Sequence, residues 1–357
     1  MFDVPQEALS LRVRTTCDQL QARIRHLPAG MPLPTMPELR RELSVSQVTL
    51  ERAYEQLEAR GLIWRKKGKG VFVADRLQTG EFAIVLRPAL LGSDASPYYR
   101  TVSSHVIRLL HDHNPRWQVR MHVGQHTATG PEFPPTLDLL DPDVLPRLRG
   151  VVSFHRLGAI GESLERAGVP ITYIGEFAGH TCAAFDQHGD FLREAMRHLR
   201  DAGCRSIGSV IYSRPLNGRF IQAFIAHASS VGLACRPEWL DQTDTCASER
   251  TGYEGFVRLW SREPRPDAIL MGDDVMCNGA LRATLRLGLR MPRNLRLVTF
   301  VSRGIDLAYH LPVSRVEYDM QELAERVVEL MLRRVRGENV TREAVLLTGR
   351  MIKGSTS

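Results

Sequence analysis

The sequence predicts a multidomain protein, with a small α+β head over residues 1–75 followed by a larger α/β domain over residues 82–357. The chain of 357 residues exceeds the size of one typical domain. Three amphipathic helical patterns and two short β-prone runs fill the head, whereas β-prone runs and helical patterns alternate throughout the remainder. The polar segment 76–81 is predicted to link the two.

Apolar spacing and capping signals predict the first two helices of the head. One stripe with spacings of three and four marks the first helix: Val13, Cys17, Leu20, Ile24 and Leu27. A second, short helix should begin after Thr35, because Thr35 and Glu38 form a capping-box pair. Pro37 lies early in this helix, where its missing N–H costs nothing, and Leu39 and Leu43 are expected to face inward.

A third helix is expected after a turn at residues 43–45, with Ser46 as its N-cap and Gly61 at its end. Its apolar positions follow the i, i+3, i+4, i+7 pattern and should be buried: Leu50, Ala53, Tyr54 and Leu57. The residues left exposed near its start are Gln47, Val48, Glu51 and Arg52. In helix-turn-helix proteins this N-terminal part of the recognition helix reaches the base edges.

Two β-prone runs, residues 62–65 and 71–73, follow the third helix and are joined by the Lys- and Gly-rich segment 66–70. Glycines permit a tight hairpin tip, and lysines at such a tip can approach phosphates or the minor groove. Six basic residues lie between positions 60 and 76, against one acidic residue, Asp75. A charge run is often only a solvated surface, but this excess is also expected of an element that contacts phosphates.

Residues 33–73 resemble the winged helix-turn-helix of the GntR family, including the turn, the Glu-x-x-Gly-Leu helix end and the Gly-x-Gly-x-Phe-Val hairpin. Thr49 and Arg52 match the family's commonest pattern, whereas Pro37, Gln47 and Glu51 stand where it has arginines. Gln47 could bond an adenine twice, and Glu51 could accept from a cytosine amine or repel phosphate, so an unusual operator sequence is expected. The resemblance implies a DNA-binding set of Thr35, Ser46, Gln47, Val48, Thr49, Glu51, Arg52, Lys66, Lys67, Gly68 and Lys69.

Beyond residue 82, alternating strands and helices predict parallel sheets with helices on both faces. The predicted strands are residues 82–86, 150–154, 171–174, 206–211, 268–271 and 297–300. No Gly-x-Gly-x-x-Gly, P-loop or Gly-x-Ser-x-Gly motif occurs at a strand-to-helix junction. The sequence therefore lacks the usual signatures of a nucleotide-cofactor enzyme or a hydrolase.

Several landmarks of this larger domain resemble the LacI-type effector domain, which has the two-lobed fold of periplasmic binding proteins. They occur in family order at residues 96–99, 184–186, 202–207, 266–269, 279–281 and 287–292. The resemblance implies a first lobe of about residues 82–180 plus 319–336, and a second lobe of about 183–316 plus 340–357. A GntR-type head on a LacI-type sensor is similar to the arabinose-repressor-like architecture.

Ligands of such folds bind between the lobes, at the carboxyl ends of the strands. The effector-binding residues that the resemblance implies are Tyr98, Tyr99, His155, Asp186, Arg219, Phe220, Asp273, Asp274 and Ser302; Arg156 and Glu176 are further candidates. Phe220 replaces a sugar-binding arginine, Asp273 a common asparagine, and Val301 an aspartate. The expected effector is therefore a small polar ligand, a sugar or sugar derivative less densely hydroxylated than a free hexose, or one that uses Arg219.

Each of these residues also has a structural interpretation. Tyr98 and Tyr99 could pack at a helix start instead of lining a ligand site, and His155 could be a hydrogen-bonded structural residue. Asp186 could be a turn former, and Asp274 could cap a helix that begins near Val275. Both interpretations stay open at the level of sequence.

The whole chain predicts a cytoplasmic homodimer that binds double-stranded operator DNA and a small-molecule effector, without a membrane segment. Its six scattered cysteines form no Cys-x-x-Cys pair, and its histidines lack metal-ligand spacing, so no metal and no cofactor are expected. Two other hypotheses remain. One is a DNA-bound structural dimer whose sensor domain has lost its ligand, and the other is an enzyme, for which no catalytic set can be named.

Overall fold

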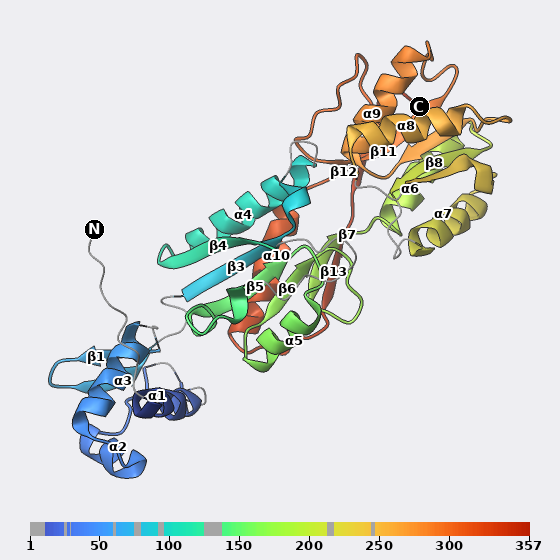
Figure 1. Ribbon diagram of the computed structural model, residues 1–357. Coiled ribbons are helices and arrows are strands. Elements are labelled where there is room, and N and C mark those ends of the chain that lie inside the picture. Colours follow the sequence, from blue (N-terminus) through green and yellow to red (C-terminus); the bar gives the residue numbers. More distant parts are fainter. Residues whose placement is uncertain are drawn as a thin grey trace, which may run out of the picture.

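The structure is a computed structural model that describes residues 11–24, 27–28, 30–59, 62–74, 80–91, 96–124, 138–212, 218–243 and 247–357. Figure 1 shows a small head and two α/β lobes, with the C-terminus in the second lobe. In the described part of the chain, no helix is both long and apolar enough to cross a bilayer.

The head consists of three helices and a hairpin: α1 (Leu11–Ile24), α2 (Met36–Leu43), α3 (Gln47–Ala59), β1 (Ile63–Lys66) and β2 (Gly70–Val73). Its core contains the predicted apolar stripes of α1 and α3, together with Leu39. Ser44 has a φ of 53° and ends α2 in a left-handed turn, which directs the chain into α3. The predicted helix-turn-helix and hairpin are therefore confirmed, although α1 ends at Ile24, before Leu27.

The first lobe contains a parallel sheet of β3 (Gly80–Leu86), β4 (Trp117–Val123), β5 (Leu148–Ser153), β6 (Ile171–Ile174), β7 (Cys182–Phe185) and β13 (Ala344–Leu347), in the order β13-β7-β6-β5-β3-β4. The helices α4 (Pro97–His113) and α10 (Met320–Val335) pack on each other, and their buried residues join one core. The helix α5 (Gly158–Arg166) contributes to a separate apolar cluster with other sheet residues. The sheet thus has helices on both faces, as predicted.

The second lobe contains β8 (Ile207–Tyr212), β9 (Leu240–Thr243), β10 (Ala268–Met271), β11 (Arg296–Ser302), β12 (Ser314–Tyr318) and β14 (Arg350–Ile352), in the order β14-β12-β11-β10-β8-β9. All pairs are parallel except β12 with β14. The helices α6 (Asp190–Asp201) and α7 (Gly218–Ser230) contribute to the core shared with the first lobe. The helices α8 (Glu249–Trp260) and α9 (Asp274–Arg286) pack on each other in a second cluster.

Strand pairing corrects the predicted lobe boundaries at two places. Residues 183–185 belong to β7, which pairs with β6 and β13 in the first lobe, so the chain crosses to the second lobe only after Phe185. Residues 344–347 form β13 and also belong to the first lobe, whereas β14 pairs with β12 in the second. These errors arise because a strand's sheet is decided by its partners rather than by its own sequence.

Strand β3 begins earlier than predicted. Gly80 and Glu81 lie in β3 and pair with β4, so the end of the predicted 76–81 linker is part of the sheet. Residues 75–79 lie outside the described part of the chain. Strand β11 extends through Ser302, so the buried Val301 is a strand residue and not the loop position that the sequence suggested.

Candidate functional site

The start of α3 is capped by Ser46 and exposes the predicted base-reading residues. The Ser46 Oγ accepts a hydrogen bond from the Thr49 N–H at 3.1 Å and lies 2.8 Å from the Thr49 hydroxyl. Gln47, Val48 and Arg52 are exposed, whereas Leu50, Ala53, Tyr54 and Leu57 are fully buried on the opposite face. The helix therefore presents a short polar surface at its N-terminus, where a recognition helix contacts bases.

A side-chain pair one turn apart orients the Gln47 amide. Its Nε2 donates a hydrogen bond of 2.9 Å to Glu51 Oε1. The second N–H and the amide oxygen of Gln47 stay available, and these are the two groups that bond adenine N7 and N6. Glu51 thus orients the Gln47 amide, a contact that the sequence pattern did not suggest.

The start of α2 is held by Thr35 and Glu38. One Glu38 oxygen accepts hydrogen bonds from both the backbone N–H and the hydroxyl of Thr35, each at 2.7 Å. These bonds lower the pKa of Glu38 below its ordinary value. The predicted capping pair is therefore present, and Thr35 remains exposed beside it.

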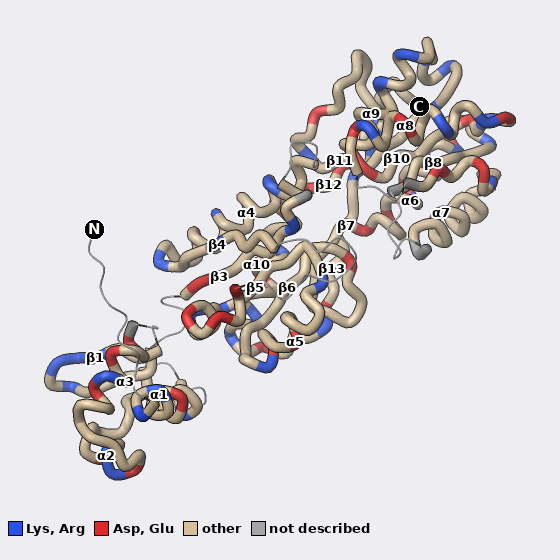
Figure 2. The backbone as a smooth tube through the Cα atoms, in the orientation of Figure 1, with Lys and Arg blue, Asp and Glu red and all other residues tan. Residues whose placement is uncertain are grey.

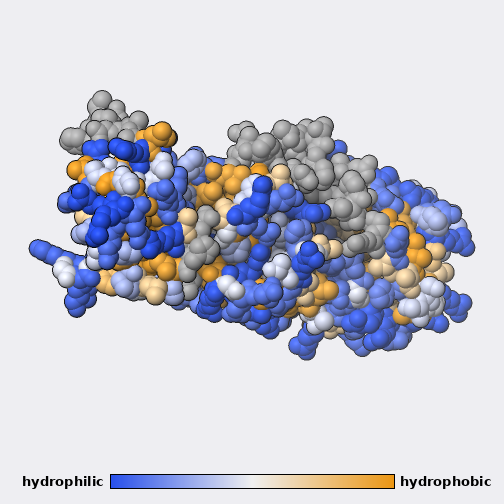
Figure 3. Space-filling model, turned by 90° about the horizontal axis from the view of Figure 1, so that it is seen from below, coloured by the Kyte–Doolittle hydropathy of each residue, from blue (hydrophilic) through white to orange (hydrophobic). Residues whose placement is uncertain are grey.

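The hairpin β1–β2 is hydrogen-bonded to α3 and has a basic tip. Trp64 and Phe72 stack with ring centroids 4.6 Å apart, and Glu58 of α3 accepts hydrogen bonds from the backbone and guanidinium of Arg65. Figure 2 shows basic residues along this hairpin, and Figure 3 shows a mostly hydrophilic surface at this end of the molecule. The exposed tip residues are Lys66, Lys67, Gly68 and Lys69. Gly68 has a φ of 73°, which allows the tight turn.

The junction between the two lobes is lined by aromatic rings from both. Tyr98 and Tyr99 at the start of α4 contact the Phe154 ring, and Tyr98 also contacts Phe185. Phe185 in turn contacts Phe300 and Tyr318 of the second lobe, with centroid distances of 5.8 and 4.8 Å. Desolvation raises the pKa of Tyr98, and the nearby Tyr99 and Asp274 add to this effect. Tyr98 and Tyr99 therefore do pack at a helix start, and they do so at the lobe junction.

Asp274 connects the lobes through a buried hydrogen bond. Its Oδ1 accepts from the Ser96 hydroxyl of the first lobe at 3.1 Å, and its Oδ2 lies 3.5 Å from the Ser302 N–H. Burial, together with the charge of the neighbouring Asp273, raises the pKa of Asp274 to about 7. The Ser302 Oγ beside it is fully buried and has no hydrogen-bond partner among the described residues. These groups form a buried polar point among the aromatic rings of the junction.

Asp273, and not Asp274, caps α9. Its side chain accepts a hydrogen bond of 2.9 Å from the Met276 N–H, and α9 begins at Asp274. The sequence placed the helix start one residue too late, because either aspartate satisfies the capping preference. This correction leaves the Asp274 carboxylate free of a capping role.

The other predicted effector residues differ in their surroundings, and several of them make structural contacts. Asp186 follows β7, and its carboxylate accepts from the N–H groups of Gly189 and Asp190, as in the turn-former interpretation. His155 is buried after β5, and its backbone hydrogen-bonds with the Ser153 hydroxyl. Phe220 contacts the His188 ring at 5.9 Å. Arg219 lies in α7, but its side chain is outside the described features.

Two contacts at the junction could not be predicted from the sequence. His188 Nδ1 lies 2.8 Å from Glu176 Oε2, which joins the end of the first lobe's β6 to the turn before α6. Ser96 was visible only as the residue before a helix-starting proline, and its bond to Asp274 spans 178 positions of sequence. Within the described residues, no group of three or more His, Cys, Asp or Glu side chains could hold a metal ion.

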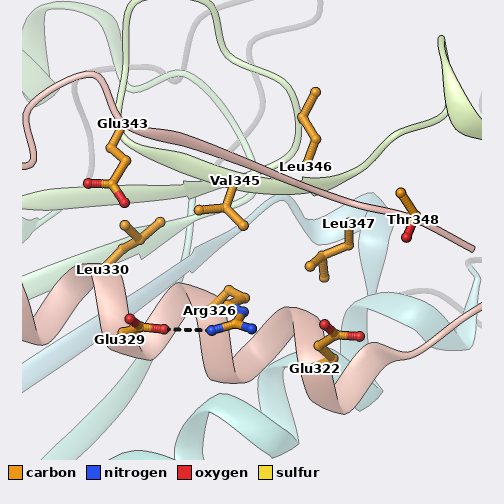
Figure 4. Close-up of a pocket in the computed structure, with 9 residues that line it drawn as sticks. All are labelled: Glu322, Arg326, Glu329, Leu330, Glu343, Val345, Leu346, Leu347 and Thr348. Atoms are coloured by element: carbon orange, nitrogen blue, oxygen red, sulfur yellow. Dashed lines mark hydrogen bonds and ion pairs between the residues drawn. The ribbon is translucent and has the colours of Figure 1, made fainter.

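A groove of about 410 Å³ lies elsewhere, between α10 and the edge strand β13 (Figure 4). Glu322, Arg326 and Glu329 of α10 face Val345 and Leu347 of β13 across it, and Arg326 pairs with Glu329 at 3.1 Å. None of the predicted effector-binding residues lines this groove.

Comparisons with known proteins agree with both parts of the chain. Residues 13–73 match the family model "Bacterial regulatory proteins, gntR family", and residues 196–357 match "Periplasmic binding protein-like domain". The HTH-type transcriptional repressor PurR of Glaesserella parasuis is 24% identical over 148 residues, which are 41% of this chain and 43% of that protein. The PurR of Serratia proteamaculans is 28% identical over 144 residues, 40% of this chain and 41% of that protein. The chain thus spans less than half the length of these curated relatives.

Solved structures share the fold at low sequence identity. The transcriptional regulator CelR–cellobiose complex matches with a TM-score of 0.63 and 19% identity, covering 88% of this chain and 92% of that one. The lac repressor dimer bound to operator and the anti-inducer ONPF matches with a TM-score of 0.64 and 18% identity, covering 86% and 98%. This chain therefore joins a DNA-binding domain of the GntR family of bacterial regulatory proteins to a two-lobed periplasmic binding protein-like domain.

Proposed function

We propose that this chain is a sequence-specific transcription regulator, a repressor that binds operator DNA as a homodimer under the control of a small polar ligand. The observation that carries this proposal is the head itself, where an exposed recognition-helix start and a lysine-bearing hairpin tip lie together on a buried apolar core. The named relatives, which are repressors and regulators, support it. They also make an enzyme the weakest of the three hypotheses.

A homodimer is proposed because one recognition helix reads only a few base pairs. Two heads related by two-fold symmetry would read the two halves of a palindromic site. The likeness of the fold to a repressor solved as an operator-bound dimer supports this arrangement. Light scattering of the full chain with and without a palindromic duplex tests it, and a one-chain complex would contradict it.

Replacing Gln47 by alanine is expected to weaken binding to the preferred operator by ~1–3 kcal/mol and to change binding to random duplex DNA little. The reason is that Gln47 offers one donor and one acceptor for adenine while Glu51 holds its amide. Fluorescence anisotropy on both duplexes measures the difference. The matched control is Gln56→Ala, which makes the same substitution in the C-terminal half of α3, away from the predicted base contacts. Equal losses on both duplexes for Gln47→Ala would make it a backbone contact.

We propose that the effector binds at the lobe junction beside Asp274. The aromatic lining supports a ligand with one apolar face, and the Asp274 carboxyl with the unpartnered Ser302 hydroxyl supports a hydrogen-bonding group on that ligand. Binding would compete with the Ser96–Asp274 bond and so would favour a different lobe arrangement. Such a ligand controls DNA binding only if the two arrangements bind it with different affinity.

The Asp274→Ala variant is expected to bind a confirmed effector more weakly by ~1.5–3 kcal/mol, the range for a hydrogen bond that involves a charged group. A thermal-shift screen with sugars and nucleosides identifies the effector, and calorimetry measures the loss. Effector affinity is measured in Asp186→Ala as well, because Asp186 is the other predicted effector carboxylate. Its oxygens already accept hydrogen bonds from the backbone at the start of α6. Effector affinity equal to wild type in both variants would contradict the junction site.

The second candidate function is a DNA-binding dimer whose two-lobed domain binds no ligand. The observation in its favour is that aromatic rings of both lobes contact one another at the junction, while Ser96 already bonds Asp274. It predicts operator binding that no small molecule changes. The same thermal-shift screen separates the candidates, since only the regulator gains stability with a ligand.

A further inference from the structure

Three segments of the chain pass between the lobes. The first is residues 186–189 between β7 and α6, the second is Asp319 between β12 and α10, and the third is residues 348–349 between β13 and β14. Because each segment connects a strand of one lobe to an element of the other, any change in lobe orientation has to bend all three. Figure 1 shows them together at the junction.

A single carboxylate connects the three segments. Asp190, the first residue of α6, lies directly after the first segment. Its Oδ2 accepts a hydrogen bond of 3.0 Å from the hydroxyl of Tyr318, which directly precedes the second segment. The same oxygen accepts a hydrogen bond of 2.6 Å from the N–H of Gly349 in the third.

The hydrogen bonds of Asp190 to Tyr318 and Gly349 are buried and closely packed. Asp190 is 3% exposed and Tyr318 is 1% exposed, so loss of the Tyr318 hydroxyl or of the Gly349 N–H would remove a hydrogen bond from a buried carboxylate that water cannot replace. Asp190 Oδ1 is satisfied by Arg193 at 2.6 Å, within α6. The backbone of Gly349 lies so close to Tyr318 that an added Cβ would be 2.6 Å from its ring. The Tyr318 ring stacks on Phe300 at 5.0 Å.

We propose that Asp190 is a positioning residue that sets the relative orientation of the two lobes by holding the three crossing segments on one carboxylate oxygen. Tyr318 is its partner from the second segment. This inference bears on regulation only if the proposed function holds. In that case Asp190 fixes the lobe orientation of the ligand-free chain, and the effector has to favour a different one. The lobe geometry itself can be tested without DNA or effector.

The test is the distance between the lobes in the full chain. Nitroxide labels on Ser104→Cys in α4 and Ser230→Cys in α7 report it by pulsed electron paramagnetic resonance, because both positions are exposed. Cys235 and Cys246 are replaced by serine, and labelled chain is diluted with unlabelled chain so that only distances within one chain are seen. Asp190→Ala is expected to replace one narrow distance peak with a broad distribution, and Tyr318→Phe, which keeps the ring, should broaden it less.

Asp241→Ala is the matched control. Asp241 is an equally buried carboxylate of the second lobe that bonds Arg258 and Arg262, away from the crossing segments. The Asp241→Ala substitution should lower the unfolding midpoint without broadening the distance peak. A wild-type peak in folded Asp190→Ala, or equal broadening in Asp241→Ala, would overturn the proposal. If Asp190→Ala does not fold, a wild-type distance peak in Tyr318→Phe overturns the proposal. Failure of the proposed function would instead appear as absent DNA binding, with the distances between the lobes unaffected.

Discussion

The variant with Lys66, Lys67 and Lys69 all replaced by alanine is expected to bind duplex DNA with a much shallower salt dependence than wild type. These side chains are exposed at the hairpin tip, where they can each neutralise one phosphate. Loss of three such contacts lowers the slope of log affinity against log salt by roughly 2.7, so the fall in affinity between 50 and 200 mM salt becomes about 40-fold smaller. Lys67→Ala alone should give about one third of this change in slope.

Fluorescence anisotropy on a random-sequence duplex at several salt concentrations measures these slopes. The control removes three arginines from exposed positions of the second lobe, Arg282, Arg290 and Arg293, and so makes the same change in net charge far along the chain from the head. This control should keep the wild-type slope. Equal slopes in the wild type and the lysine variant would show that the hairpin tip does not contact phosphates.

The Asp274→Asn variant is expected to remove a large pH dependence of stability. The pKa of Asp274 is about 7 in the folded chain, against an ordinary value of 3.8. Between these pH values the folded state binds more protons than the unfolded state, so wild-type stability falls as pH rises through this window, by at most about 4 kcal/mol from this group. The loss is complete above the folded pKa and absent below the unfolded one. Asparagine does not titrate, so this contribution should disappear.

Urea unfolding at a series of pH values from 4 to 8 measures the effect. Asp273→Asn is the informative companion variant, because asparagine still caps α9 while the neighbouring charge that raises the pKa of Asp274 is gone. In this variant the fall in stability should move to lower pH. Identical pH dependence in the wild type and Asp274→Asn would mean that the Asp274 carboxyl is not held in the buried environment described above.

The sequence predicted the head well because its structure is determined locally. The Ser46 cap, the glycines of the hairpin and the apolar spacing of α3 lie within a few residues of the contacts they form. In the lobes, the buried strands β6 and β10 were also located correctly, because they read as continuous apolar runs. The edge strand β4, whose seven residues include exposed Met121 and Val123, gave no such signal.

The candidate effector site was less predictable because it depends on distant pairs. Asp274 was named from its place after a strand, but its partner Ser96 is 178 positions away. Asp190 went unnoticed, because the residues it joins, Tyr318 and Gly349, lie 128 and 159 positions from it. Asp186 was chosen by the same rule as Asp274, yet its oxygens bond to backbone three and four residues ahead. Position after a strand therefore does not distinguish a helix cap from a residue that joins the lobes.

The proposed regulation depends above all on the ability of this chain to distinguish one DNA sequence from another. Repeated selection of bound fragments from a pool of random duplex DNA by the full chain, followed by sequencing, tests it most directly. The proposed function predicts enrichment of a two-fold symmetric site whose half-sites contain an adenine that becomes dispensable in the Gln47→Ala variant. Enrichment of no sequence above the starting pool, at a salt concentration where the chain still binds DNA, would contradict it.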